Sequence, residues 1–316
     1  MTDSILGLHH VTATVAGAQE DLEFCLGGLG LRLLKKTINF DNHNVYHFYY
    51  GSETGAPGTI WTTFPYKGWG VPVGTSGAGQ ITATGFSVPA GSLGFWSERL
   101  RRSKLATEHL TPRFGEERIG VRDASGLAFE LVAGEHDRRA PWKGGGVEPA
   151  AAIRGLHAVT LTVRSPDATL ELLTGLLGWR VAGRDGERIR VAVADGAPGQ
   201  LIDIVPAPAA AAGINGLGTV HHVAMAVATG EEQRRLRQEL IALGYKVTEV
   251  LDRNYFQSIY FREPGGVLFE LATVQPGFTV DEPLGALGTT LKLPAWEEPN
   301  REAIEAALPA ISIPAP

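Results

Sequence analysis

The chain repeats one pattern four times, at intervals of about 70 residues. Each copy begins with a glycine and a strand in which apolar and polar residues alternate, and these strands are predicted at 7–15, 79–88, 155–163 and 218–227. Leucines at helical spacing follow each strand, and three short strands come next, the last of them after a turn. A repeat of this length indicates one structural unit used several times, so we predict four modules of the form strand–helix–strand–strand–strand.

The stretch 134–152 is rich in glycine and charged residues, and it separates the second module from the third. We interpret it as a linker between two pairs of modules. The predicted domains are therefore 1–145, with modules 1 and 2, and 146–316, with modules 3 and 4 and a C-terminal extension. The extension is proline-rich and is predicted to end in a short helix at 301–308. The predicted fold class is α+β, with four βαβββ modules in two domains.

Composition excludes several classes of function. The 316 residues carry a net charge of −6, which is not typical of a nucleic-acid-binding protein. No apolar run is long enough to cross a bilayer, and the first residues do not resemble a signal peptide. Cys25 is the only cysteine, so no internal disulfide can form. We therefore expect a cytoplasmic protein with no nucleic-acid or membrane partner, and a homo-oligomer is a base-rate expectation.

Alternation assigns the two faces of each opening strand. In the first strand three apolar residues share the face that is predicted to pack on the module's helix: Val11, Ala13 and Val15. His10 and Thr12 then face the other way, where small and hydroxyl side chains leave room for a cavity. The fourth strand places His222 on the same second face. His9 and His221, one residue earlier in each strand, fall on the opposite parity.

Alignment of the four copies singles out three residues. At the place of His10 the copies have, in order, His10, Ala83, Ala158 and His222. At the place of Glu270, in the closing strand, they have Thr63, Glu130, Ile204 and Glu270. Modules 1 and 4 together offer two imidazoles and a carboxylate, provided that they lie side by side. Glu130 lacks histidine partners, and we interpret it as paired with an arginine such as Arg122.

Two histidines and one carboxylate on one face are the ligand set of non-heme Fe(II) enzymes, and they leave coordination positions open. Fe(II) is therefore the predicted metal, with Mn(II) or Zn(II) as alternatives. The competing interpretation is structural, because strand histidines are often hydrogen-bonded and a buried glutamate often pairs with arginine. Two further aromatic residues of the first module, His47 and Trp61, could line the same cavity.

Several motifs resemble those of the vicinal-oxygen-chelate superfamily, which contains glyoxalases, bleomycin-resistance proteins and extradiol dioxygenases. Within it the chain resembles ring-cleaving dioxygenases of the hydroquinone and chlorohydroquinone type. The matching stretches are 8–12, 35–41, 46–49, 58–60, 220–222, 252–260 and 264–270. This resemblance implies curved mixed sheets that form open barrels around a cavity, and it covers essentially the whole chain.

The resemblance also implies a site and a reaction. Fe(II) would be bound by His10, His222 and Glu270, and O2 would cleave the ring of a small aromatic diol of hydroquinone or catechol type. The residues implied around the metal are His9, Thr12, His221, Arg253 and Tyr260. Tyr260 or His221 would move protons, and Arg253 would stabilise an anionic oxygen.

Two other functions of the same superfamily are weighed against this one. A glyoxalase-like isomerase would need a fourth ligand, and the aligned position holds Thr63, which cannot replace a carboxylate. A non-catalytic small-molecule-binding protein would use a cavity without a redox metal, and the complete His–His–Glu set argues against it.

Overall fold

The computed structural model describes residues 4–135 and 137–314 and contains the four predicted modules. Module 1 consists of β1 (Ile5–Val15), α1 (Ala18–Leu22), which continues as the π-helix η1 (Glu23–Gly28), β2 (Arg32–Asn39), β3 (Asn42–Gly51) and β4 (Ile60–Pro65). Module 2 consists of β5 (Gln80–Pro89), α2 (Leu93–Arg102), β6 (Thr107–Arg113), β7 (Glu116–Arg122) and β8 (Ala128–Gly134).

Modules 3 and 4 follow the same order. Module 3 consists of β9 (Gly155–Val163), α3 (Asp167–Glu171), which continues as the π-helix η2 (Leu172–Leu176), β10 (Arg180–Asp185), β11 (Arg188–Ala192) and β12 (Leu201–Pro206). Module 4 consists of β13 (Thr219–Val227), α4 (Gly230–Ala242), β14 (Leu251–Asp252), β15 (Phe256–Arg262) and β16 (Leu268–Pro276). The extension contains the 3-10 turns η3 (Phe278–Val280), η4 (Leu284–Ala286) and η5 (Glu298–Asn300) and the helix α5 (Arg301–Ala307).

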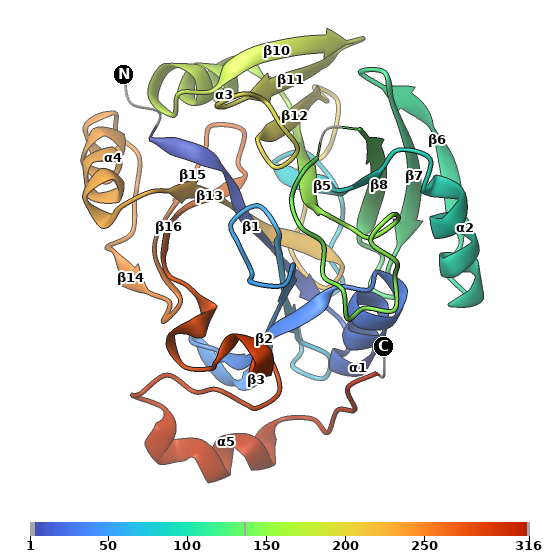
Figure 1. Ribbon diagram of the computed structural model, residues 1–316. Helices are drawn as coiled ribbons and strands as arrows, with labels where there is room; N and C mark the ends of the chain where they lie inside the picture. Colours follow the sequence, from blue (N-terminus) through green and yellow to red (C-terminus); the bar gives the residue numbers. More distant parts are fainter. Residues whose placement is uncertain (1–3, 136, 315–316) are drawn as a thin grey trace.

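The strands form two eight-stranded mixed sheets that each curve round an interior (Figure 1). One sheet has the order β14-β15-β16-β13-β1-β4-β3-β2 and joins module 1 to module 4. The other has the order β10-β11-β12-β9-β5-β8-β7-β6 and joins module 2 to module 3. Each sheet thus takes strands from both sides of the predicted boundary at 145/146. The division into domains 1–145 and 146–316 stays a prediction.

The first and fourth modules meet through their opening strands, as the metal hypothesis requires. β1 and β13 run antiparallel, and Thr12 is paired with His222. Inside each module the opening and closing strands run parallel, β1 with β4 and β13 with β16. This arrangement places the closing strands of both modules on the two sides of the central β1–β13 pair.

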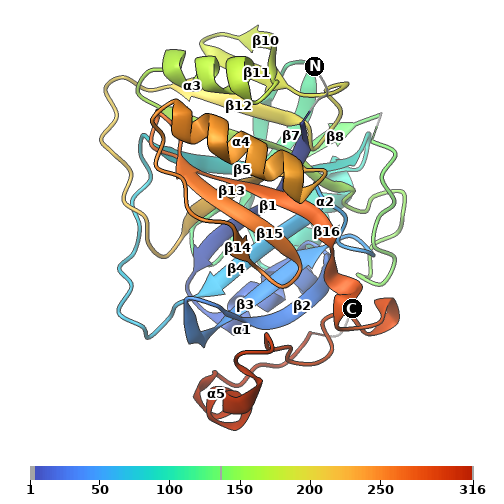
Figure 2. The same ribbon diagram turned by 90° about the vertical axis from the view of Figure 1, so that its left-hand side faces the viewer.

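Helices cover the outer faces of the sheets, where the predicted apolar faces are buried. Val11 of β1 and Leu22 of α1 belong to the same core. Figure 2 shows α4 lying across the strands of module 4, which it contacts at β13, β15 and β16. Gly30, Gly178 and Gly244 follow three of the helical segments with φ of 66°, 73° and 91°, a conformation that favours glycine.

The C-terminal extension crosses the module 1 side of the first sheet. Its helix α5 contacts β3, and Ser312 exchanges hydrogen bonds with Gln19 of α1. Figure 1 accordingly shows the last described residues of the extension beside α1. In the described part of the chain, no helix is long and apolar enough to cross a membrane.

Candidate metal site and its cavity

Three buried donor atoms converge at the centre of the first sheet. Glu270 Oε2 lies 2.9 Å from His222 Nε2 and 3.2 Å from His10 Nε2, and the two Nε2 atoms are 3.3 Å apart. His10 comes from β1, His222 from β13 and Glu270 from β16, so one ligand atom arrives from each of three adjacent strands. The structure therefore brings together the three predicted ligands.

These three residues fit a metal ion better than they fit one another. Glu270 Oε2 is buried and has no partner with hydrogen-bond geometry among the described residues, although both imidazoles are close to it. Burial alone would raise the pKa of the Glu270 carboxyl, but the His10 and His222 imidazoles hold that pKa well below its ordinary value. An ionised carboxylate and two nitrogen donors aimed at one point form a ligand set for a divalent cation.

The side-chain atoms of the three residues that point away from the convergence point, Glu270 Oε1 and the two Nδ1 atoms, each have a neighbouring polar partner. The Ser258 hydroxyl donates a hydrogen bond of 2.5 Å to Glu270 Oε1. His10 Nδ1 lies 2.9 Å from His9 Nδ1, and His222 Nδ1 lies 2.7 Å from His221 Nδ1. When Nε2 of a histidine binds a metal, Nδ1 carries the proton and a partner there fixes the ring. His9 and His221 are placed to be those partners.

Strand bulges explain why neighbouring histidines reach the same site. The β1–β13 register passes from Leu8–Met225 to His10–Ala224 and from Thr12–His222 to Ala13–Val220. One extra residue is thus accommodated at His9 and another at His221, and a bulge re-aims the side chain that it carries. The simple alternation that predicted His9 and His221 on the opposite face therefore does not hold at these two positions.

A cavity of about 380 Å³ opens over the ligands, and the predicted residues Thr12, His221, Arg253 and Tyr260 line it. Arg253 Nε donates to the Tyr260 hydroxyl at 3.2 Å. Burial lowers the pKa of His221 to about 3 and raises the pKa of Tyr260 above its ordinary value, so both side chains are neutral. His9 is buried behind His10 and is not a lining residue.

His47 of β3 and Trp61 of β4 were both considered as residues that could line the cavity, and only one of them does. His47 lines the cavity, as the sequence suggested. Trp61 does not, because its ring is buried against Phe86 and Phe129 in the core on the other side of the sheet. Ser258 was missed, although alternation from Tyr260 along β15 places it on the same face.

The observed register corrects the alignment of the closing strands by one residue in two modules. Ala224, two residues after His222, is paired with Glu270. The equivalent pairs in the other modules are Thr12 with Thr62, Gly85 with Glu130, and Thr160 with Asp203. The residues equivalent to Glu270 are therefore Thr62 and Asp203, not Thr63 and Ile204. Thr63 lies on the opposite face, where its hydroxyl donates to Asp21.

In the second sheet the equivalent place is filled by ion pairs. Arg190 binds both oxygens of Asp203, at 2.7 and 3.1 Å, and it also binds Glu116 at 2.7 Å. Glu130 is paired with Arg113 and Arg118, so the expected partner Arg122 is wrong. Arg122 instead donates to the carbonyl of Gly126. With Ala83 and Ala158 in place of the histidines, this sheet keeps two carboxylates, but arginines neutralise them.

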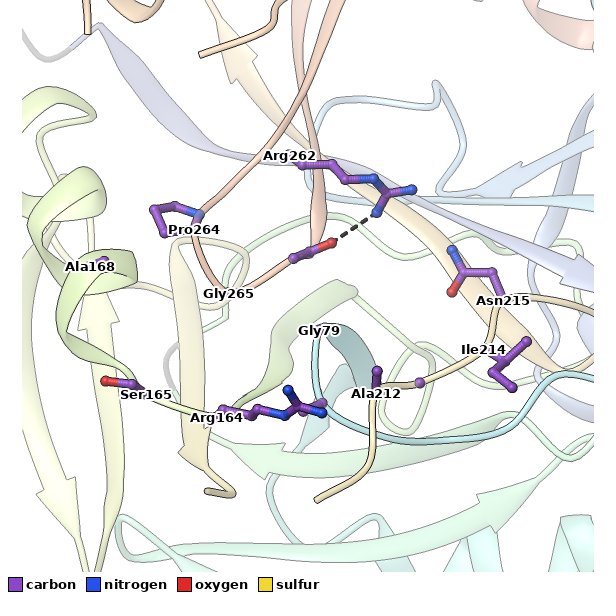
Figure 3. A pocket seen from close by; sticks show the side chains of 13 residues that line it. Gly79, Arg164, Ser165, Ala168, Ala212, Ile214, Asn215, Arg262, Pro264 and Gly265 are labelled. Atoms are coloured by element: carbon purple, nitrogen blue, oxygen red, sulfur yellow. Dashed lines mark hydrogen bonds between the residues drawn. The ribbon is translucent and has the colours of Figure 1, made fainter. Parts of the chain in front are cut away.

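A larger cavity, of about 750 Å³, lies elsewhere on the molecule (Figure 3). Its two arginines, Arg164 and Arg262, are exposed, and each donates to a backbone carbonyl, of Ala210 and Gly266 respectively. The buried histidines and carboxylate are absent from its lining residues. The smaller cavity over His10, His222 and Glu270 is therefore the candidate active site.

Comparison with known proteins places this site in a family context. The family described as the glyoxalase/bleomycin resistance protein/dioxygenase superfamily matches residues 155–271. The chain is 44% identical over 306 residues to MhqE of Bacillus subtilis (strain 168), named as a candidate ring-cleaving dioxygenase, with coverage of 96% of this chain and 99% of MhqE. It is 36% identical over 301 residues to the chlorohydroquinone/hydroquinone 1,2-dioxygenase of Sphingobium indicum, with coverage of 93% and 92%. The crystal structure of a candidate dioxygenase from Bacillus subtilis superposes with a TM-score of 0.94 at 40% identity, and it covers 100% of both chains.

Proposed function

We propose that this chain, which belongs to the glyoxalase/bleomycin resistance protein/dioxygenase superfamily, is a ring-cleaving dioxygenase acting on a small aromatic diol of hydroquinone or catechol type. The observation that carries the proposal is the convergence of His10, His222 and Glu270 at the floor of a cavity of substrate size. The names of the relatives support ring cleavage as the reaction.

Fe(II) is the metal that we assign to this site, because two imidazoles and one carboxylate leave coordination positions open. Bound there, Fe(II) would supply a redox-active Lewis-acid centre that both reactants can reach. Thr62 supports this assignment over a glyoxalase-like isomerase, since the fourth corner of the site carries a hydroxyl and no carboxylate.

The surrounding residues act on the substrate through hydrogen bonds and charge. Arg253 and Tyr260 form one wall, and the guanidinium stabilises negative charge that develops on a substrate oxygen. The Tyr260 phenol stays protonated and can donate a proton. His221 is neutral at physiological pH, and because its Nδ1 accepts from His222, its Nε2 carries the proton and can donate a hydrogen bond to a substrate oxygen.

Replacement of Glu270 tests the metal assignment. Glu270→Gln keeps the shape of the side chain and removes its charge, so Fe(II) affinity should fall by more than the roughly 10- to 100-fold loss typical of changes behind a ligand. Metal content after anaerobic reconstitution and dialysis, together with oxygen uptake on hydroquinone and catechol, is the measurement. Glu130→Gln, at the equivalent place in the second sheet, should keep full metal content.

The outcomes separate the possible functions. Full metal content and full oxygen uptake in Glu270→Gln would contradict the proposed site. A wild-type protein that binds Fe(II) but takes up no oxygen with either diol would contradict the dioxygenase and favour an isomerase of the same superfamily.

A further inference from the structure

Strand β3 of module 1 and strand β15 of module 4 are equivalent strands of the repeat. Tyr49 of β3 is paired with Thr62, and Tyr260 of β15 is paired with Glu270. Equivalent sides of the two strands therefore face the cavity, and so does the residue two places before each tyrosine. In β3 this residue is His47.

His47 holds in module 1 the place that Ser258 holds in module 4. Ser258 donates to Glu270, the carboxylate that we assign to the metal. His47 Nε2 lies 2.8 Å from Thr62 Oγ1, which lies 2.9 Å from Thr12 Oγ1. Ser258 thus contacts a carboxylate assigned to the metal, whereas His47 contacts the hydroxyl of Thr62 and, through it, the hydroxyl of Thr12. His47 therefore does not orient a metal ligand, and its other ring nitrogen can bind a group in the cavity.

The imidazole of His47 is held in one orientation. Its ring lies 4.0 Å from the ring of Tyr49 and 4.3 Å from the ring of Phe64, measured between centroids. His47 Nδ1 has no hydrogen-bond partner among residues 4–135 and 137–314, while the side chain lines the cavity. Burial lowers the pKa of His47 well below its ordinary value, so the ring is neutral. It offers one fixed position that donates or accepts according to its tautomer.

We propose that His47 binds the ring hydroxyl of the substrate that is remote from the metal ligands, and so selects aromatic diols over monophenols. The inference rests on the proposed ring-cleaving function and assigns the substrate specificity of that same site. A hydroxyl both donates and accepts, so it matches either tautomer of a neutral imidazole. A methyl group at the same place can neither donate nor accept, so it leaves that imidazole nitrogen unpaired.

Binding in the absence of oxygen tests the role of His47. The Fe(II)-loaded protein is titrated by calorimetry with hydroquinone and with 4-methylphenol, which differ only by a hydroxyl or a methyl group at the para position. The wild type should bind hydroquinone about 10-fold more tightly, because 4-methylphenol leaves the imidazole nitrogen unpaired. His47→Leu should bind both ligands alike, and His47→Gln should recover part of the preference. His43→Leu, on the exposed part of the same strand, should keep the wild-type ratio.

Thr62 is a positioning residue in this arrangement, because it acts on the substrate only through His47. Thr62→Val should reduce the preference for hydroquinone by freeing the imidazole ring. Thr63→Val, on the opposite face of β4, should lower stability and leave the binding ratio unchanged.

Equal binding of the two ligands by the wild type would overturn the proposal, even if the variants failed to fold. An unchanged ratio in folded His47→Leu would overturn it too, while oxygen uptake on hydroquinone would keep the proposed function standing. The reverse result is distinct: a His47-dependent preference without oxygen uptake on any diol would support this binding role and reject ring cleavage.

Discussion

At the scale of single residues, the two halves of the site differ at one corner. Glu270 of module 4 and Thr62 of module 1 occupy equivalent positions beside the central strands. A carboxylate binds a divalent cation, whereas a threonine hydroxyl here bonds to Thr12 and His47. This one difference leaves three ligands and an open side, and a reaction with two small reactants needs that open side.

Asp21 is a second residue with a consequence that can be measured. It is buried, and it accepts hydrogen bonds from the hydroxyls of Tyr50 at 2.7 Å and Thr63 at 2.5 Å. Burial raises the pKa of Asp21 from 3.8 to about 7. The folded chain therefore holds this proton more tightly than the unfolded chain, and the resulting stabilisation is complete below the unfolded pKa and is lost as the pH rises through the folded pKa.

We predict that the free energy of unfolding decreases between about pH 4 and about pH 7, by up to about 1.4 kcal/mol per pH unit, relative to Asp21→Asn. The comparison isolates Asp21 because asparagine has no proton to lose in this range. Urea unfolding of both proteins across the window measures the effect, and parallel pH profiles for the two proteins would contradict it.

At the scale of elements, periodicity predicted most of the architecture. The strand–helix–strand–strand–strand order and the triad of His10, His222 and Glu270 were visible in the sequence, because alternation and the repeat place them directly. The bulges at His9 and His221 were not visible, because a bulge is defined by the pairing of two strands and the residue sequence of one strand does not show it. Closing-strand register was wrong at positions 62 and 203 because sequence spacing does not define strand pairing.

Strand β2 is tied to the C-terminal extension by a buried lysine. Lys35 is fully buried, and its Nζ donates to Asp281 at 2.6 Å and to Glu282 at 2.5 Å. Asp281 also accepts from the hydroxyl of Tyr255 at 3.1 Å, two residues after Arg253. The extension thus connects β2 to the turn that carries the arginine of the cavity.

Lys35→Met should lower the free energy of unfolding by about 3–5 kcal/mol, since it leaves the buried Glu282 carboxylate without its cation. It should also raise KM for the diol, because the turn that carries Arg253 loses part of its support. Chemical unfolding and steady-state oxygen uptake measure the two effects. Lys36→Met, the neighbouring lysine on the opposite face of β2, serves as the control, and equal losses in the two variants would refute a specific role for Lys35.

At the scale of the whole molecule, the two sheets have the same plan and different centres. The first sheet keeps a ligand set under a cavity, and the second closes the equivalent place with ion pairs among Arg190, Asp203 and their neighbours. Buried charges that have such partners are costly to separate. We therefore infer that the second sheet contributes to the stability of the fold and that the first sheet carries the candidate site.

Arg190→Met should therefore cost about 3–5 kcal/mol of stability, because it leaves the buried Asp203 short of its bidentate partner. Metal content and oxygen uptake per folded molecule should not change, since the cavity lies in the other sheet. Arg235→Met, which breaks an exposed pair with Glu239 on α4, should cost less than about 1 kcal/mol. Loss of metal from folded Arg190→Met would contradict the separation of roles.

The pairing of modules 1 with 4 and 2 with 3 nests one sheet inside the other along the chain. During synthesis on a ribosome, the strands of the inner pair are complete once Pro206 has emerged, whereas the outer pair waits for Pro276. Until His222 emerges, β1 displays His10 on an edge with no β13 beside it, and the set of proposed metal ligands is complete only once Glu270 has been added. Binding by all three proposed ligands is thus restricted to chains that extend past Glu270, which lies in the last strand of the last module.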